Sequence, residues 1–235
     1  MRTKVLLCAA AVAAGALSSM AQSNVYSLNV VGYVNVPIVG GGSYNMIANP
    51  LNNTGTGGNN ISNLFSAVAQ DGDTIFRWNV NNFDFDGTQP TYSGLTHAWS
   101  STFNLNLGEA VWYIDGGNNV TNTFVGEVFQ GSYTNVTGPA NGGRGLVGGG
   151  SYNAVASSAP IGGGFTNSIV GIVPNDGDTI FPWDVTAFDF AAVQPTYSAL
   201  THSWSHTEVQ IPPGIGFVYI NNGSDQQWVR TFTVQ

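Results

Sequence analysis

Two stretches of the chain decide its architecture, because the second repeats the first. Residues 71–99 read DGDTIFRWNVNNFDFDGTQPTYSGLTHAW, and residues 176–204 read DGDTIFPWDVTAFDFAAVQPTYSALTHSW. They align without a gap and share 20 of 29 residues, a density that composition alone does not produce. A repeat at a fixed spacing, here about 105 residues, marks the size of one structural unit. The sequence therefore predicts an internal duplication.

Strand signals dominate both copies. Short segments of alternating apolar and polar residues are bounded by Gly, Asn, Asp or Pro, a pattern typical of strands joined by turns. These segments are 26–36, 44–48, 74–80, 98–105, 110–114 and 121–129 in the first copy, and 152–156, 179–185, 202–211, 216–220 and 228–234 in the second. We therefore expect an all-β fold of two tandem antiparallel β-sandwich units, jelly-roll or immunoglobulin-like.

One short helix is expected in each unit. Four apolar residues at helical spacing follow the capping candidates Asn59 and Asn60, namely Ile61, Leu64, Phe65 and Val68. The counterpart in the second unit is 166–173. A segment rich in Gly, Asn and Pro separates the units, so we predict a first repeat at 22–130, a linker at 131–147 and a second repeat at 148–235.

The first 21 residues have the features of an export signal. Arg2 and Lys4 precede an apolar run, and the small residues of Ser19-Met20-Ala21 stand before Gln22. No later stretch reaches the roughly 18 apolar residues of a membrane helix, so we expect no transmembrane anchor. The mature chain, 22–235, is expected to be secreted, extracellular or attached to the cell surface.

The charge of the mature chain excludes one class of partner. Three arginines, no lysine and 13 acidic residues remain after residue 21. Nucleic-acid binding requires clustered cations that displace counterions from phosphates, so this partner class is excluded. A surface with few charges opposes contact between copies only weakly, which favours self-association.

A boundary strand occurs in three versions. Residues 29–34 resemble 123–128, and 230–234 resemble the latter again. The leading version either completes the sheet of its own unit or pairs with a neighbouring molecule, and the second alternative would generate a filament by strand donation. The face that would form this assembly strand comprises Tyr26, Leu28, Val30, Val34 and Val36.

Catalytic motifs are weak throughout. No Gly-x-Ser-x-Gly elbow precedes the histidines, and the glycine runs lack the lysine of a P-loop. A glycosidase needs two carboxylates facing one bond, yet Glu109 and Glu127 correspond to Ile215 and Thr233 in the second unit. We therefore expect a protein that is not an enzyme.

Metal binding has one candidate set. Asp71, Asp73, Asp176 and Asp178 stand in two Asp-Gly-Asp motifs and offer oxygen ligands to calcium. The alternative, which we favour, is a tight turn in which the central Gly takes a positive φ. No cofactor is otherwise expected. His97 and His202 precede a Trp by two residues, and we interpret them as structural residues on strands.

The aromatic residues offer a second function. Sugars stack on flat rings while polar side chains reach their hydroxyls, which would suit polysaccharide binding. The candidates are the rings Trp112, Trp228, Tyr92 and Tyr197 with the amides Gln89 and Gln194. Trp78 and Trp99 are expected to fill the cores. Trp112, which becomes Val218 in the second unit, and Trp228 are expected to be exposed.

The motifs YNMIANP (44–50), IFRW (75–78), LGEAVW (107–112) and TFV (123–125), with the opening VYSLNVVGYV (25–34), resemble uncharacterised β-rich repeat modules of exported proteins from environmental Gram-negative bacteria. The resemblance covers both units and brings no catalytic residues. It implies a secreted or cell-surface β-module of a Gram-negative bacterium. We therefore expect a structural or adhesive protein, able to assemble through its leading strand, with carbohydrate binding as the alternative.

Overall fold

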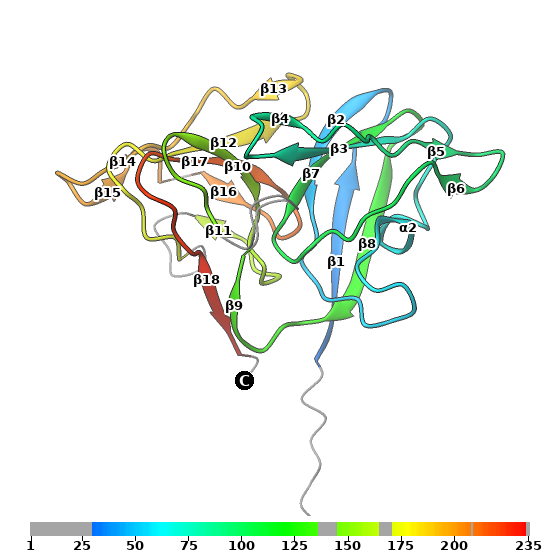
Figure 1. Ribbon diagram of the computed structural model, residues 1–235, viewed down its shortest axis with the longest axis horizontal. Helices are drawn as coiled ribbons and strands as arrows, with labels where there is room; N and C mark the ends of the chain where they lie inside the picture. Colours follow the sequence, from blue (N-terminus) through cyan, green and yellow to red (C-terminus); the bar gives the residue numbers. More distant parts are fainter. Residues whose placement is uncertain (1–29, 136–144, 165–170, 208, 234–235) are drawn as a thin grey trace, which may run out of the picture.

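The protein is all-β, as the sequence predicts, and Figure 1 shows its computed structural model. The structure describes residues 30–135, 145–164, 171–207 and 209–233. The predicted export signal, Tyr26 and Leu28 lie outside the described residues. No helix among the described residues is long and apolar enough to cross a membrane.

Short strands make up both halves. The elements of the first half are β1 (Val31–Ile38), β2 (Ser43–Ala48), α2 (Ile61–Leu64), β3 (Thr74–Asn79), β4 (Asp84–Phe85), β5 (Tyr92–Ser93), β6 (Ala98–Trp99), β7 (Ala110–Asp115) and β8 (Val120–Glu127). Those of the second are β9 (Gly131–Thr134), β10 (Ser151–Val155), β11 (Gly163–Gly164), β12 (Thr179–Asp184), β13 (Asp189–Phe190), β14 (Tyr197–Ser198), β15 (Ser203–Trp204), β16 (Gln210–Ile211), β17 (Phe217–Asn221) and β18 (Val229–Phe232).

The two halves share one strand order. A four-stranded antiparallel sheet runs β2-β7-β3-β4 in the first half and β10-β17-β12-β13 in the second. Each half adds one small hairpin, β5–β6 or β14–β15, and one two-stranded sheet, β1–β8 or β9–β18. The second half has a further short pair, β11–β16. The repeated stretches thus occupy matching places, because they supply β3 to β6 and β12 to β15.

The leading strand closes onto its own half. Strand β1 pairs with β8 over its whole length, from Val31 opposite Glu127 to Ile38 opposite Val120. The side chains of Val34 and Val36 are buried on the inner face of β1, as the period-two pattern predicts. Of the two alternatives for the leading strand, the structure shows pairing within its own chain.

The predicted linker contains a strand. Residues 131–134 form β9, which pairs with β18 from Gly131 opposite Phe232 to Thr134 opposite Val229. The assignment of 131–147 to a linker is therefore wrong at its start, because this segment supplies the boundary strand of the second half. Residues 136–144 lie outside the described residues.

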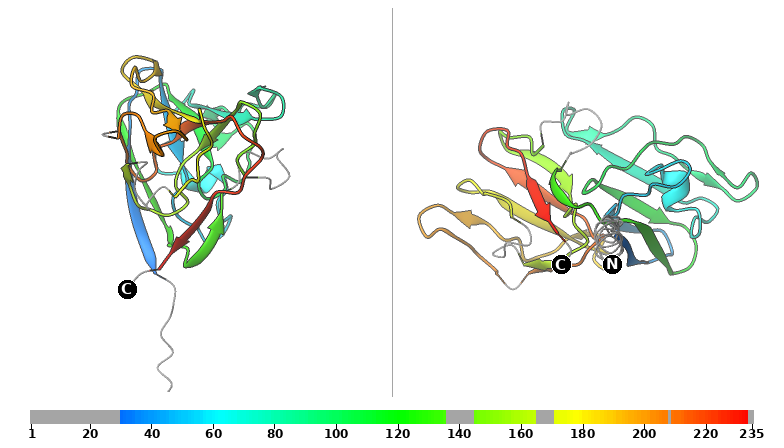
Figure 2. Two further views of the ribbon diagram at one scale, coloured as in Figure 1. Left: turned by 90° about the vertical axis from the view of Figure 1, so that its left-hand side faces the viewer. Right: turned by 90° about the horizontal axis from the view of Figure 1, so that it is seen from below.

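Three apolar clusters hold the layers together. In the first, Ile47, Ile75 and Tyr113 face β1 and β8, and in the second Val155, Ile180 and Tyr219 occupy matching positions. The intervening residues of the same strands point the other way and form a third cluster, shared by both halves: Met46, Ala48, Ala110, Trp112, Ala154, Ala156 and Val218. The right-hand view of Figure 2, from below, shows the two halves side by side. The expectation of two tandem sandwich units did not include an apolar core shared between them.

The predicted first helix is present but short. Asn60 caps α2 by accepting the N–H of Ser62 at 3.0 Å, as its sequence position indicates. All four residues of the predicted apolar stripe are buried. Most of the expected second helix lies outside the described residues, and Val173 at its end is exposed.

Candidate functional site

An apolar hollow lies between the two four-stranded sheets. We call it the aromatic pocket. Its volume is about 370 Å³ and its wall is entirely apolar. The lining residues come from both halves and form matching pairs, except that Trp112 of the first half corresponds to Val218 of the second: Tyr44, Trp78, Phe85, Trp112, Tyr152, Trp183, Phe190 and Val218.

Strand register explains why rings surround this hollow. The third cluster contains four alanines beside Met46, Trp112 and Val218, and partly buried aromatic rings pack against it. Met46 pairs with Trp112 on β7, and Ala154 pairs with Val218 on β17. The second half thus has a small side chain where the first has an indole, and this difference leaves space between the sheets.

Edge-to-face contacts fix the rings of the pocket. The ring of Phe85 meets Trp78 at 5.4 Å and Trp112 at 5.3 Å, with interplanar angles of 85° and 89°. Across the halves, Trp112 and Trp183 lie 6.1 Å apart at 88°. Perpendicular aromatic pairs are favoured by the ring quadrupole, so the wall is held in a defined shape.

Reciprocal hydrogen bonds join the halves beside the pocket. The indole N–H of Trp78 donates to the carbonyl of Tyr152 at 2.7 Å, and that of Trp183 donates to the carbonyl of Tyr44 at 2.6 Å. Both indoles are half-buried, so the prediction that Trp78 fills the core of its own half is wrong. Each half supplies an acceptor that the other half needs.

Exposed rings form the rim of the pocket. Tyr44, Phe83, Tyr152 and Phe188 are between 39% and 54% exposed. Phe83 and Phe188 occupy the turns after β3 and β12 with φ of 51° and 55°, a left-handed conformation that is uncommon for a bulky residue. The Phe83 ring lies 6.1 Å from Tyr152 of the other half. The turn after β3 therefore places a ring beside the opposite half.

Two predicted binding residues are buried rather than exposed. Trp112 is 5% exposed because β7 is a central strand covered on both faces, although it does line the aromatic pocket. Trp228 is 1% exposed and packs against Phe217 at 6.1 Å in the second cluster. The prediction of exposure is therefore wrong for both, because their neighbours in space were not visible in the sequence.

The remaining predicted sugar-binding residues lie elsewhere. Tyr92 packs on Trp99 at 5.4 Å and Tyr197 packs on Trp204 at 5.5 Å, each at the edge of its own cluster. Trp99 is buried, as predicted. The two predicted amide side chains lie in the segments before these tyrosines. Gln89 is exposed, and the side chain of Gln194 donates to the carbonyl of Ala191 at 3.3 Å. The four predicted rings are thus divided among three clusters.

The Asp-Gly-Asp motifs form tight turns, as favoured above. Gly72 and Gly177 have φ of 87° and 79°. Asp73 is buried and accepts the N–H of Gln70 at 2.7 Å, and Asp178 accepts the corresponding N–H of Asn175 at 2.7 Å. Asp71 and Asp176 each accept the N–H of a residue in the facing hairpin, Gly94 at 2.6 Å and Ala199 at 2.8 Å.

A buried tyrosine completes each turn. The hydroxyl of Tyr113 donates to Asp73 at 2.5 Å, and that of Tyr219 donates to Asp178 at 2.5 Å. Burial, followed by the adjacent carboxylate, raises the pKa of both tyrosines well above the ordinary value. Within the described ranges, no group of three or more His, Cys, Asp or Glu side chains is placed to hold a metal ion.

The histidines sit in turns rather than on strands. His97 and His202 are exposed in the β5–β6 and β14–β15 hairpins, which project at opposite ends of the molecule (Figure 1), with φ of 51° and 50°. Their predicted place on a strand is wrong, because each turn includes the histidine and the strand begins only at the next residue, Ala98 or Ser203.

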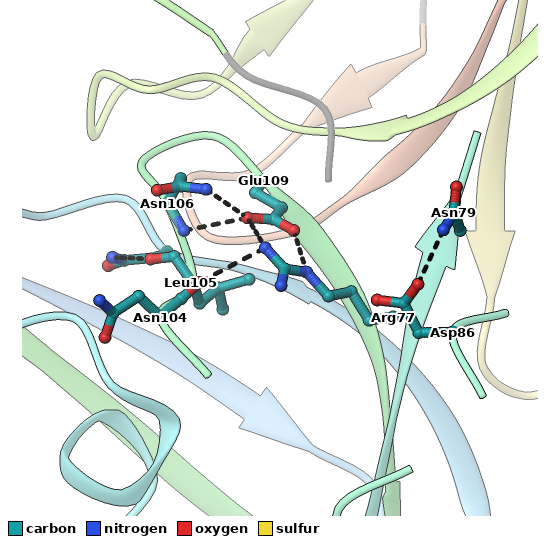
Figure 3. Close-up of polar contacts among 8 residues, drawn as sticks. Arg77, Asn79, Asp86, Asn104, Leu105, Asn106 and Glu109 are labelled. Carbon is teal, nitrogen blue, oxygen red and sulfur yellow. Dashed lines mark hydrogen bonds and ion pairs between the residues drawn. The ribbon is translucent and has the colours of Figure 1, made fainter. Parts of the chain in front are cut away.

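A buried ion pair lies in the first half. Arg77 Nε and Nη2 donate to the two carboxylate oxygens of Glu109 at 2.6 and 2.9 Å (Figure 3). Asn106 donates to the same carboxylate through its backbone N–H at 3.1 Å and its side chain at 2.9 Å. Glu109 is 1% exposed and Arg77 is 7% exposed. Pro182 and Ile215 stand at the matching positions of the second half.

Comparison of this chain with protein-family models, with curated proteins and with solved structures finds no match.

Proposed function

We propose that this protein is an exported, non-enzymatic adhesive protein that holds a flat apolar group of its partner in the aromatic pocket. The observation that carries this proposal is a wall of seven aromatic side chains and one valine, contributed by both halves, around about 370 Å³. Small-molecule pockets have volumes of roughly 300–1,000 Å³. Contiguous exposed apolar patches, such as the ring-bearing rim, mark binding surfaces in soluble proteins.

The chemistry of the wall favours an apolar ligand over a polysaccharide at this pocket. Sugar recognition needs hydrogen-bonding groups beside the stacking rings. Here the indole N–H groups of Trp78 and Trp183 already donate to backbone carbonyls. A ring or a short hydrocarbon chain needs no partner for hydrogen bonds on entering, whereas a hydroxyl would lose its bonds to water.

A non-catalytic role agrees with the state of the acidic residues. The Glu109 carboxylate accepts bonds from Arg77 and Asn106, and it is closed off from solvent. Asp73 and Asp178 are committed to their turns. A general acid or base must reach a proton of the substrate, which these carboxylates do not.

Self-association takes a modified form in this proposal. Donation of the leading strand would require β1 to leave β8 and expose Val34 and Val36. Over the described residues, only β8 pairs with β1, so the other edge of β1 has no strand partner there. Its outer face carries the exposed apolar residues Val31 and Tyr33. Addition of a second copy at this edge would leave both cores intact.

A neutral fluorescent ring tests the pocket. We expect residues 22–235 to bind one N-phenyl-1-naphthylamine per chain, with a saturable rise in emission. Val218→Trp places the indole of the first half at the matching position and should abolish this binding by filling the pocket. Val229→Trp, the same substitution at an exposed site on β18, should not. Unfolding curves establish that both variants fold.

A second variant keeps the test decisive if Val218→Trp is unstable. Phe190→Ala removes one half-buried wall ring that contacts Trp183 at 5.2 Å. It should weaken binding by roughly tenfold, the equivalent of about 1.4 kcal/mol. Binding unchanged in both pocket variants would refute the proposed site.

A further inference from the structure

A second hollow lies on the first half alone. It has a volume of about 380 Å³ and is bounded by the turn that follows β4 and by residues 101–103. We call it the polar hollow, because its wall mixes charged, hydroxyl and apolar side chains: Arg77, Asp86, Thr88, Ser101, Thr102 and Phe103. It shares no lining residue with the aromatic pocket.

A carboxylate and a guanidinium both line the polar hollow. The backbone N–H of Asp86 donates to the carbonyl of Arg77 at 2.8 Å, which places the two residues next to each other on adjacent segments. One oxygen of Asp86 accepts the side-chain amide of Asn79 at 3.0 Å (Figure 3). The Ser101 hydroxyl is buried, and no described group bonds to it. A hydroxyl in this state indicates a ligand or water partner.

Arg77 is held rigidly with one nitrogen to spare. Glu109 takes Nε and Nη2, the carbonyl of Asn104 accepts from Nη2 at 3.4 Å, and the Phe103 ring lies 4.5 Å from the guanidinium carbon. Among the described residues, no acceptor bonds to Nη1, which leaves it for a ligand. A donor fixed in this way loses little side-chain entropy on binding.

The second half shows that the fold does not require these polar residues. At the matching positions, Arg77 becomes Pro182, Asp86 becomes Ala191, Thr88 becomes Val193 and Glu109 becomes Ile215. The second half nevertheless keeps the same sheet order. Buried ion pairs are on average no more stabilising than apolar residues in their place. Three of these four side chains line the hollow and Glu109 holds one of them in place, which indicates binding rather than stability.

We propose that the polar hollow binds a neutral sugar unit. Adjacent sugar hydroxyls can accept from Arg77 and donate to Asp86 at the same time. The apolar C–H face of a pyranose can pack on Phe103. An anionic ligand is disfavoured, because Arg77 is neutralised by Glu109, Asp86 adds a negative charge, and the chain has a formal net charge of −8.

Calorimetry with three uncharged oligosaccharides tests this site. Residues 22–235 are titrated with cellohexaose, mannohexaose and chitohexaose, and at least one should bind with one site per chain. Asp86→Ala, which installs the residue of the second half, should weaken that binding at least tenfold. Asp84→Ala, which removes an exposed carboxylate two residues away, should leave it unchanged.

The two proposed sites fail independently. Asp86→Ala should keep the N-phenyl-1-naphthylamine signal, and Val218→Trp should keep sugar binding. The sugar proposal is overturned if none of the three oligosaccharides binds, or if Asp86→Ala titrates like the unmodified chain. Either result leaves the aromatic pocket untouched.

Discussion

Removing the buried carboxylate of Glu109 should destabilise the first half strongly. In Glu109→Ile, Arg77 loses two charge-assisted hydrogen bonds while it stays almost fully buried. An uncompensated buried charge of this kind costs about 3–5 kcal/mol. Because whole domains are stable by only about 5–15 kcal/mol, the change should be evident in urea unfolding followed by tryptophan fluorescence.

A double variant separates charge from packing. Arg77→Met with Glu109→Ile replaces the pair by apolar side chains, as the second half does with Pro182 and Ile215. We expect its stability to return to within about 1.5 kcal/mol of the unmodified chain. Glu127→Ile, the same substitution at a half-exposed position of β8, serves as the control. The reasoning is refuted if Glu109→Ile costs less than about 1 kcal/mol, or if the double variant is as unstable as the single one.

Three further predictions follow from the contacts within and between the halves. Trp78→Phe and Trp183→Phe each remove one reciprocal hydrogen bond and should cost a similar ~1 kcal/mol in thermal unfolding; a cost confined to one of them would contradict the equivalence of the two contacts. The raised pKa of Tyr113 and Tyr219 keeps both hydroxyls protonated in the folded state, so stability should be full below the ordinary value of 10.0 and fall as the pH rises past it. Tyr113→Phe should flatten that alkaline loss in urea titrations, and an unchanged slope would exclude this cause. Gly216→Ala would bring a Cβ within 2.6 Å of a β7 side chain and 2.9 Å of a β2 side chain, so it should cost about 1–3 kcal/mol, measured as a lower Tm; an unchanged Tm would mean that the sheets can separate freely.

Local patterns predicted the elements well. The alternation around Val34 and Val36 indicated a half-buried strand, and the Asp-Gly-Asp motifs indicated turns with a positive φ at glycine. Each signal depends on residues adjacent in sequence. The hexapeptide GGGSYN at 40–45 and 148–153 is a further repeat whose role is local: Asn45 and Asn153 bond to the backbone of the turn that precedes their strand.

The site depends on contacts that no local pattern contains. A central strand that is covered on both faces carries apolar residues at successive positions. Such a run does not tell which of its residues face the core of their own half and which face the other half. Trp112 was therefore assigned to the surface, although it faces the other half. Its replacement by Val218 was the signal available in the sequence, because a large-to-small change at matching positions indicates an asymmetric interior.

The reciprocal contacts between the halves have a consequence for how the binding surfaces arose. Two identical subunits related by a twofold axis make every contact in duplicate, so any residue change in a homodimer alters both sides of the axis together. Here Trp78 and Trp183 make the paired contacts of such a dimer inside one polypeptide. Covalent linkage lets one copy keep an indole or an arginine while the other replaces it. The molecule keeps the paired contacts of a symmetric dimer, yet the two halves give its aromatic pocket unlike walls, and the polar hollow has its lining residues in the first half.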